Sequence, residues 1–94
     1  RHVGDLTELT ASERNEISGL SAHAMKTLRK VSGANGFNLG MNQGAVAGAG
    51  VADHIHQHVI PRWAGDANFM PLIGQTKVLP QLLQETRSQL AEAW

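Results

Sequence analysis

Near its middle the chain reads Asp53-His54-Ile55-His56-Gln57-His58-Val59-Ile60, in which three histidines alternate with other residues. Successive side chains of a β-strand point to opposite faces, so residues two apart share a face. We therefore predict a strand over residues 53–60, with the histidines on one face and Ile55 and Val59 on the other. A helix would scatter the imidazoles around its circumference. Because packing does not require three titratable groups on one face, the pattern indicates a functional site.

A second predicted strand completes a hairpin. Asn35-Gly36 is a turn signal, and residues 37–42 alternate apolar positions with asparagine or glycine, which is typical of a half-buried strand. Residues 43–52, between the two strands, carry no charge. A hairpin of strands 37–42 and 53–60 would bring Asn42 near the histidine end.

A long helix is predicted before the hairpin. Thr10 and Glu13 have the spacing of a capping box, and the apolar residues after them repeat at helical intervals. Gly33 is suited to end the helix, which sets its bounds at residues 11–32. His23 lies beside the apolar stripe and is interpreted as a structural or surface histidine.

A second helix is predicted after the hairpin. A few extended residues are expected at 72–73, and Pro80 suits the first turn of a helix over residues 79–93. The sum is an α+β chain with only two strands. Because two strands do not make a stable sheet, we expect further strands to be missing from this chain or to come from a partner.

The composition narrows the class of protein. The 94 residues make one small domain or part of one, with no apolar run long enough to span a bilayer and no signal-peptide pattern. The chain has no cysteine, which excludes disulfides and thiolate zinc sites and favours a cytoplasmic location. Eight basic residues balance eight acidic ones, so the basic excess of a nucleic-acid binder is missing. We therefore expect neither a membrane nor a nucleic-acid partner.

The loop before the histidines contains Gly48-Ala49-Gly50. Asp53 stands where a dinucleotide fingerprint needs its third glycine, a strand follows where a helix is needed, and the phosphate-loop pattern is also missing. Two interpretations remain. The loop either binds an anion through its backbone N–H groups or is a hairpin loop without a binding role. We favour anion binding because the loop adjoins three histidines.

Three interpretations of the histidines compete: surface groups, metal ligands or catalytic groups. Two histidines two apart on a strand can share one zinc ion, but Asp53 and Gln57 point to the other face, and the nearest further carboxylate is Asp66. Alternatively, the middle histidine, His56, is a nucleophile, because neutral imidazole is nucleophilic near pH 7. The flanking imidazoles would then contact phosphate oxygens and protonate a leaving group. The pattern favours the nucleophile over the metal site.

The run from His54 to Ile60 resembles the signature of the histidine triad (HIT) family, in which three histidines alternate with apolar residues, although Gln57 takes an apolar position. The segments 38–44, 61–69 and 77–83 resemble the bacterial branch that contains diadenosine tetraphosphate phosphorylases and hydrolases. The resemblance covers residues 1–94 as a single HIT domain. Family members begin with additional strands, so the chain resembles the C-terminal part of the family domain.

The resemblance implies a fold and an assembly. The family fold is a five-stranded antiparallel sheet with a long helix and a C-terminal helix, and its N-terminal strands are expected to be absent from this chain. Family members are usually dimeric through the long helix and a strand, which implies a homodimer.

The resemblance also implies nucleotidyl transfer in two steps. His56 would attack the α-phosphorus of an adenine nucleotide, such as a dinucleoside polyphosphate, and carry the nucleotidyl group covalently. His54 and His58 would hold the phosphate and help the leaving group to depart, and Asn42 matches a position near the phosphates. Water as the acceptor makes a hydrolase and inorganic phosphate makes a phosphorylase. No metal and no cofactor are implied.

One departure from the family concerns phosphate binding. Four residues before the first histidine, relatives commonly carry Ser or Gln, whereas this chain has Gly50. Only backbone amides of the loop, at Gly48, Ala49 and Gly50, would then contact phosphate. Trp63 is a candidate for stacking on the base, and packing at the sheet edge is an equal alternative. The alternative functions are a purine nucleoside phosphoramidate hydrolase of the same family and a nucleotide-binding protein with little turnover.

Overall fold

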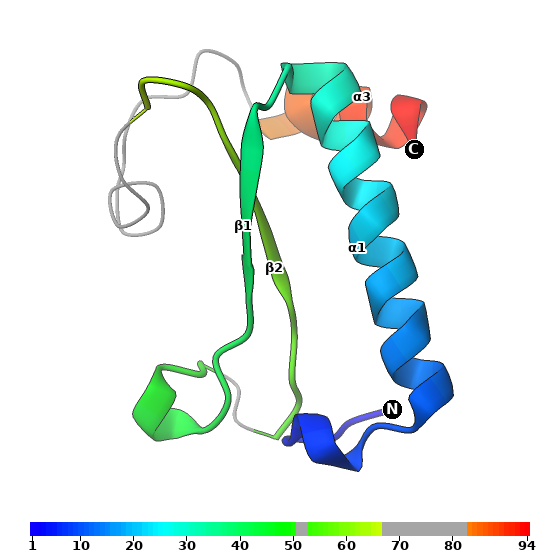
Figure 1. Cartoon of the computed structure of the whole chain (residues 1–94), viewed down its shortest axis with the longest axis vertical. Helices are drawn as coiled ribbons and strands as arrows, with labels where there is room; N and C mark the ends of the chain where they lie inside the picture. Colours follow the sequence, from blue (N-terminus) through cyan, green and yellow to red (C-terminus); the bar gives the residue numbers. More distant parts are fainter. Residues whose placement is uncertain (51–52, 67–82) are drawn as a thin grey trace.

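The computed structural model describes residues 1–50, 53–66 and 83–94 and has an α+β architecture (Figure 1). Its elements, in which η marks a short 3-10 helix, are η1 (Leu6–Glu8), α1 (Ala11–Ser32), β1 (Gly36–Gly40), η2 (Ala45–Ala47), β2 (His58–Arg62) and α3 (Leu83–Ala93). Helix α1 lies alongside the hairpin of β1 and β2, and α3 packs near the C-terminal end of α1. The predicted extended residues 72–73 and the start of the predicted last helix, 79–82, lie outside the described residues.

The predicted long helix is confirmed with its bounds, residues 11–32. The hydroxyl of Thr10 accepts a hydrogen bond from the Glu13 N–H at 3.1 Å, and the Glu13 carboxylate accepts one from the Thr10 N–H at 2.8 Å. This reciprocal pair satisfies two amides that have no partner inside the helix. At the other end Gly33 adopts a left-handed conformation (φ 67°) and donates its N–H to the carbonyl of Arg29. Local sequence signals therefore set both ends of α1.

An ion pair adds a pH-dependent contact at the start of α1. The guanidinium of Arg1 donates to both Glu13 carboxylate oxygens, at 3.0 and 2.8 Å. These bonds, with the one from the Thr10 N–H, lower the pKa of Glu13 from 4.5 to about 2. Because folding favours the charged carboxylate, the stabilisation is fully present above pH 4.5 and is lost as the pH falls towards 2.

We therefore expect the wild type to be more stable than Glu13→Gln above pH 4.5, and this difference to shrink towards zero near pH 2. Urea unfolding followed by helical circular dichroism measures the free energy of unfolding at each pH. Glu16→Gln, on the same helix and outside this ion pair, is the control and should show no such convergence. A wild-type advantage that stayed constant from neutral pH to pH 2 would contradict the role of the Glu13 charge.

The predicted hairpin is confirmed, but the bounds of its strands differ. Strands β1 and β2 pair antiparallel, with Gly36 opposite Arg62 and Gly40 opposite His58. The histidine strand therefore begins at His58 and not at Asp53. The reason lies in the N-terminal segment, because the N–H of Ile55 donates to the carbonyl of Val3 at 2.8 Å. Residues 53–57 thus belong to a turn and to a segment without regular secondary structure beside the N-terminal residues.

The two faces of the hairpin have different neighbours. On one face, the amide of Gln57 donates to the Ser21 hydroxyl of α1 at 2.8 Å, and the Arg29 guanidinium lies 5.1 Å from the centre of the Phe37 ring. Because side chains alternate along a strand, the residues that flank Phe37 and Gln57 in the sequence point away from α1. Among them, Asn38, His56 and His58 line the pocket described below.

The described residues bury little apolar surface. Val3, Leu9 and Ala34 are the buried apolar residues, and no large side chain among the described residues is fully buried. By contrast, Leu20 on α1 is 52% exposed and Leu39 on β1 is 50% exposed. In the described part of the chain, β1 and β2 each form backbone hydrogen bonds with a neighbouring strand along only one of their two edges.

None of the helices in that part is long and apolar enough to cross a membrane.

Candidate active site

The hairpin face that points away from α1 contributes to a pocket of about 490 Å³. Cross-strand partners point to the same side of an antiparallel pair, so the register sets Asn38 beside Ile60 and Gly40 beside His58. The lining residues are Asn38, Leu39, Gly40, Met41, Asn42, Gly48, Gly50, His56, His58 and Ile60. Of the described residues that line the pocket, none is a carboxylate, a lysine or an arginine. The pocket is therefore an open, mostly neutral site with two imidazoles.

The three predicted histidines lie in one row. The rings of His54 and His56 are 5.7 Å apart at an interplanar angle of 60°, and those of His56 and His58 are 5.1 Å apart at 78°. His54 also meets the ring of His2 edge-on at 5.2 Å. His56 and His58 line the pocket, whereas His54 is not part of the lining. The structure thus brings the imidazoles together although two of them precede β2.

The two ring nitrogens of His56 are not equivalent. Its Nδ1 atom is buried, and no group among the described residues hydrogen-bonds to it. A buried atom cannot reach a ligand, so Nε2 is the nitrogen available for bonding to one. For Nε2 to carry a lone pair, the neutral ring must hold its proton on Nδ1. Of the two ring nitrogens of His56, Nε2 is therefore the one that a ligand in the pocket can reach.

The glycine loop uses most of its amides internally. The N–H of Gly48 donates to the Ala45 carbonyl at 3.0 Å, and that of Ala49 donates to the Gly44 carbonyl at 3.2 Å. These bonds hold η2, which is flanked by Gly44 and Gly48 at positive φ. The N–H groups of Gly48 and Ala49 are therefore already used within the loop, and the role of these two residues in phosphate binding stays a prediction. The Gly50 N–H makes no hydrogen bond with any described residue, and Gly50 lines the pocket.

The structure brings only some of the other predicted residues to this pocket. Asn42 lines it, and its amide nitrogen would lie 3.7 Å from a Cβ placed on Gly48. Ala49 is not part of the lining. Trp63 lies beyond the far end of β2, where its indole N–H donates to the Ser32 carbonyl at 2.9 Å. This bond fits the packing interpretation of Trp63, and its role in base stacking stays a prediction.

Sequence reasoning missed one set of polar residues on the pocket face. Asn38 lines the pocket, and its side-chain oxygen accepts a hydrogen bond from Arg62 at 2.6 Å. Arg62 in turn pairs with Asp66, whose carboxylate raises the pKa of the guanidinium. The alternation of residues 37–42 already placed Asn38 on the same face as Asn42, so the sequence did contain a signal for this residue.

Among the described residues no group of three or more His, Cys, Asp or Glu side chains is placed to hold a metal.

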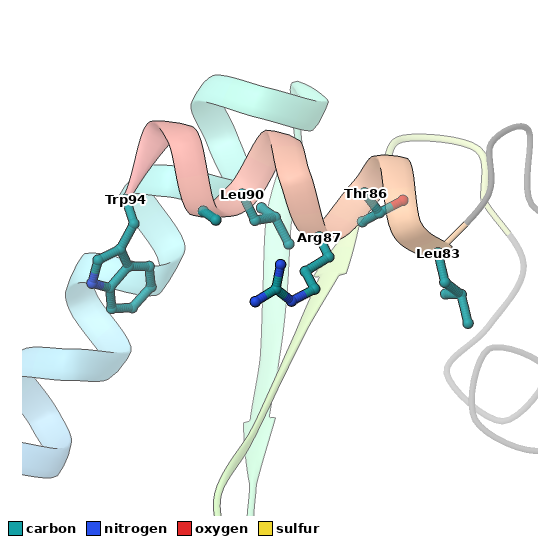
Figure 2. A pocket seen from close by; sticks show the side chains of 6 residues that line it. Leu83, Thr86, Arg87, Leu90 and Trp94 are labelled. Carbon is teal, nitrogen blue, oxygen red and sulfur yellow. The ribbon is translucent and has the colours of Figure 1, made fainter.

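A second pocket lies on α3 and differs from the histidine pocket in its lining. It measures about 400 Å³ and is lined by Leu83, Thr86, Arg87, Leu90, Ala91 and Trp94 (Figure 2). Figure 2 shows that Leu83 and Leu90 point to the same side of the helix as Arg87. The described residues of this lining include no imidazole and no carboxylate, so the histidine pocket is the candidate active site.

Comparison with known proteins shows which family this chain resembles. The family model described as HIT domain matches residues 1–65. A Mycobacterium tuberculosis protein named AP-4-A phosphorylase is 47% identical over all 94 residues, which cover 48% of that protein. The chain thus spans about half the length of this relative.

Two solved structures share the fold. A zinc-bound histidine triad family protein from Mycobacterium smegmatis superposes with a TM-score of 0.67 at 25% identity, over 98% of this chain and 64% of that one. A histidine triad protein from Sinorhizobium meliloti gives a TM-score of 0.67 at 26% identity, over 97% and 64% of the two chains. The chain therefore matches about two thirds of each of these folds.

Proposed function

Since the chain belongs to the HIT domain family, we propose that it acts in an enzyme that cleaves dinucleoside polyphosphates of the diadenosine tetraphosphate type. The observation that carries the proposal is the pocket itself, in which His56 and His58 share the lining with Asn42 and with Gly50, whose N–H bonds to no described residue. Hydrogen-bond donors, with no carboxylate among the described lining residues, suit a polyphosphate anion. The name of the tuberculosis relative supports the same substrate class.

The chemistry we propose has two balanced steps. In the first, Nε2 of His56 forms a bond to the α-phosphorus while the bond from that phosphorus to the bridging oxygen breaks. The oxygen leaves with the electron pair, and protonated His58 supplies its proton. In the second, water or inorganic phosphate attacks the phosphorus, the P–N bond breaks, and the acceptor's proton passes to His58. In this mechanism His54, whose ring lies 5.7 Å from that of His56, helps to hold the phosphate.

Intact-mass spectrometry tests this covalent route. The protein is mixed briefly with diadenosine tetraphosphate and quenched in alkali, because phosphoramidate bonds to histidine are labile in acid. We expect an adenylyl adduct on the wild type and none on His56→Ala. Nucleotide products from the wild type with no adduct under rapid quenching would contradict the covalent step. Binding without any product would favour the alternative of a nucleotide-binding protein with little turnover.

A second candidate function keeps the same mechanism with a different leaving group. The apolar and neutral lining of the pocket also suits a purine nucleoside phosphoramidate, whose leaving group is an amine. A panel that compares diadenosine tetraphosphate with adenosine phosphoramidate separates the two. A higher kcat/KM for the phosphoramidate would favour this alternative.

Gly50 gives a prediction about phosphate affinity. A Cβ on Gly50 would meet no atom within 4 Å, and its φ is not positive, so serine fits without strain. Gly50→Ser adds a hydroxyl donor beside the Gly50 amide, which hydrogen-bonds to no described residue. We expect the Kd for AMP to fall about three- to tenfold, as one added hydrogen bond to an anion allows. Isothermal titration measures it, and Gly50→Ala, without the hydroxyl, is the matched control that should gain nothing.

We also propose that the chain forms a homodimer and works in the cytoplasm, without a cofactor. Support for the dimer comes from Leu20 on α1, which is 52% exposed in a chain whose described residues include few buried apolar ones. Light scattering coupled to gel filtration should show a dimer for the wild type and a monomer for Leu20→Lys. Val46→Lys, at a fully exposed loop position, is the control and should stay dimeric. A dimeric Leu20→Lys would place the interface elsewhere.

A further inference from the structure

A chain of hydrogen bonds runs from the end of β2 into the pocket. The Asp66 carboxylate accepts from the Nε and Nη2 of Arg62, both at 2.9 Å, and from the Trp63 N–H at 3.1 Å. The remaining nitrogen of the guanidinium, Nη1, donates to the side-chain oxygen of Asn38 at 2.6 Å. Two parallel bonds to one carboxylate fix the plane of a guanidinium. Arg62 therefore reaches Asn38 in a fixed orientation.

This contact determines which way the Asn38 amide points. A guanidinium has five N–H donors and no acceptor, so only the amide oxygen can face it. The Asn38 NH2 group must then point away from Arg62, and no described residue accepts a hydrogen bond from it. Asn38 lines the histidine pocket, so two N–H donors remain available there.

The position of Asn38 sets its distance from the histidines. Its strand neighbours on the pocket face are Gly36 and Gly40, neither of which has a side chain, and Gly40 is the partner of His58. A Cβ on either glycine would meet nothing within 4 Å. Residues two apart on a strand are roughly 6.6 Å apart. Asn38 therefore lies one strand step beyond His58 along open pocket surface.

We propose that Asn38 binds the phosphates beyond the one attacked by His56, and that Arg62 is a positioning residue for its amide. This inference rests on the proposed function, because it assumes that the pocket holds a polyphosphate. A row of linked phosphates extends away from the attacked phosphorus and reaches an amide one strand step away. Asn38 then selects for polyphosphate length, because a mononucleotide ends before it.

The test compares ligands of different length. Kd values for AMP and diadenosine tetraphosphate are measured by isothermal titration in a His56→Ala background, where no turnover consumes the ligand. Asn38→Asp still offers an oxygen to Arg62 but replaces the N–H donors with a negative charge. We expect it to raise the Kd for diadenosine tetraphosphate by about tenfold or more and to change that for AMP by less than about threefold.

Arg62→Lys separates positioning from a purely structural role. Lysine keeps the charge but lacks the planar fork that fixes Asn38. It should weaken binding of diadenosine tetraphosphate about threefold or more and leave AMP binding unchanged. Equal losses for the two ligands, in either variant, would overturn the inference. So would unchanged binding of diadenosine tetraphosphate by Asn38→Asp.

The same titrations distinguish this inference from the proposed function. If the His56→Ala parent binds neither ligand, the proposed nucleotide site is wrong and the role of Asn38 fails with it. If the parent binds both ligands and Asn38→Asp does not discriminate between them, the nucleotide site stands and only the role of Asn38 is overturned. Circular dichroism of each variant checks that the exposed Asn38 position tolerates the change.

Discussion

His56→Ala is expected to lower kcat/KM for diadenosine tetraphosphate by at least about 10⁴-fold, because the nucleophile of a covalent mechanism cannot be bypassed without a different reaction path. His58→Ala, which removes only the proposed proton donor, should cost about 10²- to 10⁴-fold. Ion-exchange chromatography of the nucleotide products measures both rates. The loss should be larger for His56→Ala than for His58→Ala, because the two rings share one pocket but have different proposed roles, nucleophile and proton donor.

The matched control is His23→Ala. The His23 ring lies outside the pocket, on α1, where its Nε2 is 2.6 Å from the Trp94 carbonyl and the two rings meet edge-on. Its loss removes an imidazole without touching the proposed chemistry, so kcat/KM should stay near the wild-type value. Wild-type turnover by His56→Ala would contradict the nucleophile. A loss in His23→Ala as large as in His56→Ala would show that the assay reports folding and not chemistry.

Local signals in the sequence were sufficient for α1. The capping box of Thr10 and Glu13 and the left-handed Gly33 are interactions between residues three or four apart, so the sequence alone determines them. The alternation of residues 37–42 likewise identified a strand. The structure adds the register, because pairing between β1 and β2 depends on residues that lie far apart in the chain.

The start of β2 and the amides of the loop could not be predicted in this way. Ile55 has the side-chain pattern of a strand residue, yet its N–H bonds to Val3, more than fifty positions earlier. The loop has the composition of an anion site, yet the N–H groups of Gly48 and Ala49 donate to carbonyl groups of the loop itself, at Ala45 and Gly44. Composition indicates which residues are able to bind a phosphate, but only the backbone path shows which amides are free to do so.

Gly40→Val should separate binding from folding more sharply than any other single change in the pocket. Gly40 lies on β1 opposite His58, its φ is not positive, and a Cβ there would meet nothing within 4 Å. Valine is favoured in strands, whereas glycine costs roughly 0.5–1 kcal/mol there, so the variant should be as stable as the wild type or more stable. Its side chain would nevertheless fill space beside His58 that the proposed ligand needs.

We therefore expect Gly40→Val to raise the Kd for diadenosine tetraphosphate by about tenfold to a hundredfold, the range of a one- to three-kcal/mol steric cost, while the melting temperature stays level or rises. Gly36→Val is the matched control, because Gly36 lies on the same face of the same strand but does not line the pocket. It should leave the Kd within about threefold of the wild type. Unchanged affinity in Gly40→Val would mean that the ligand does not lie over β1. Unfolding of Gly40→Val would mean that this face is packed rather than open, because the only new group is a side chain directed into the pocket.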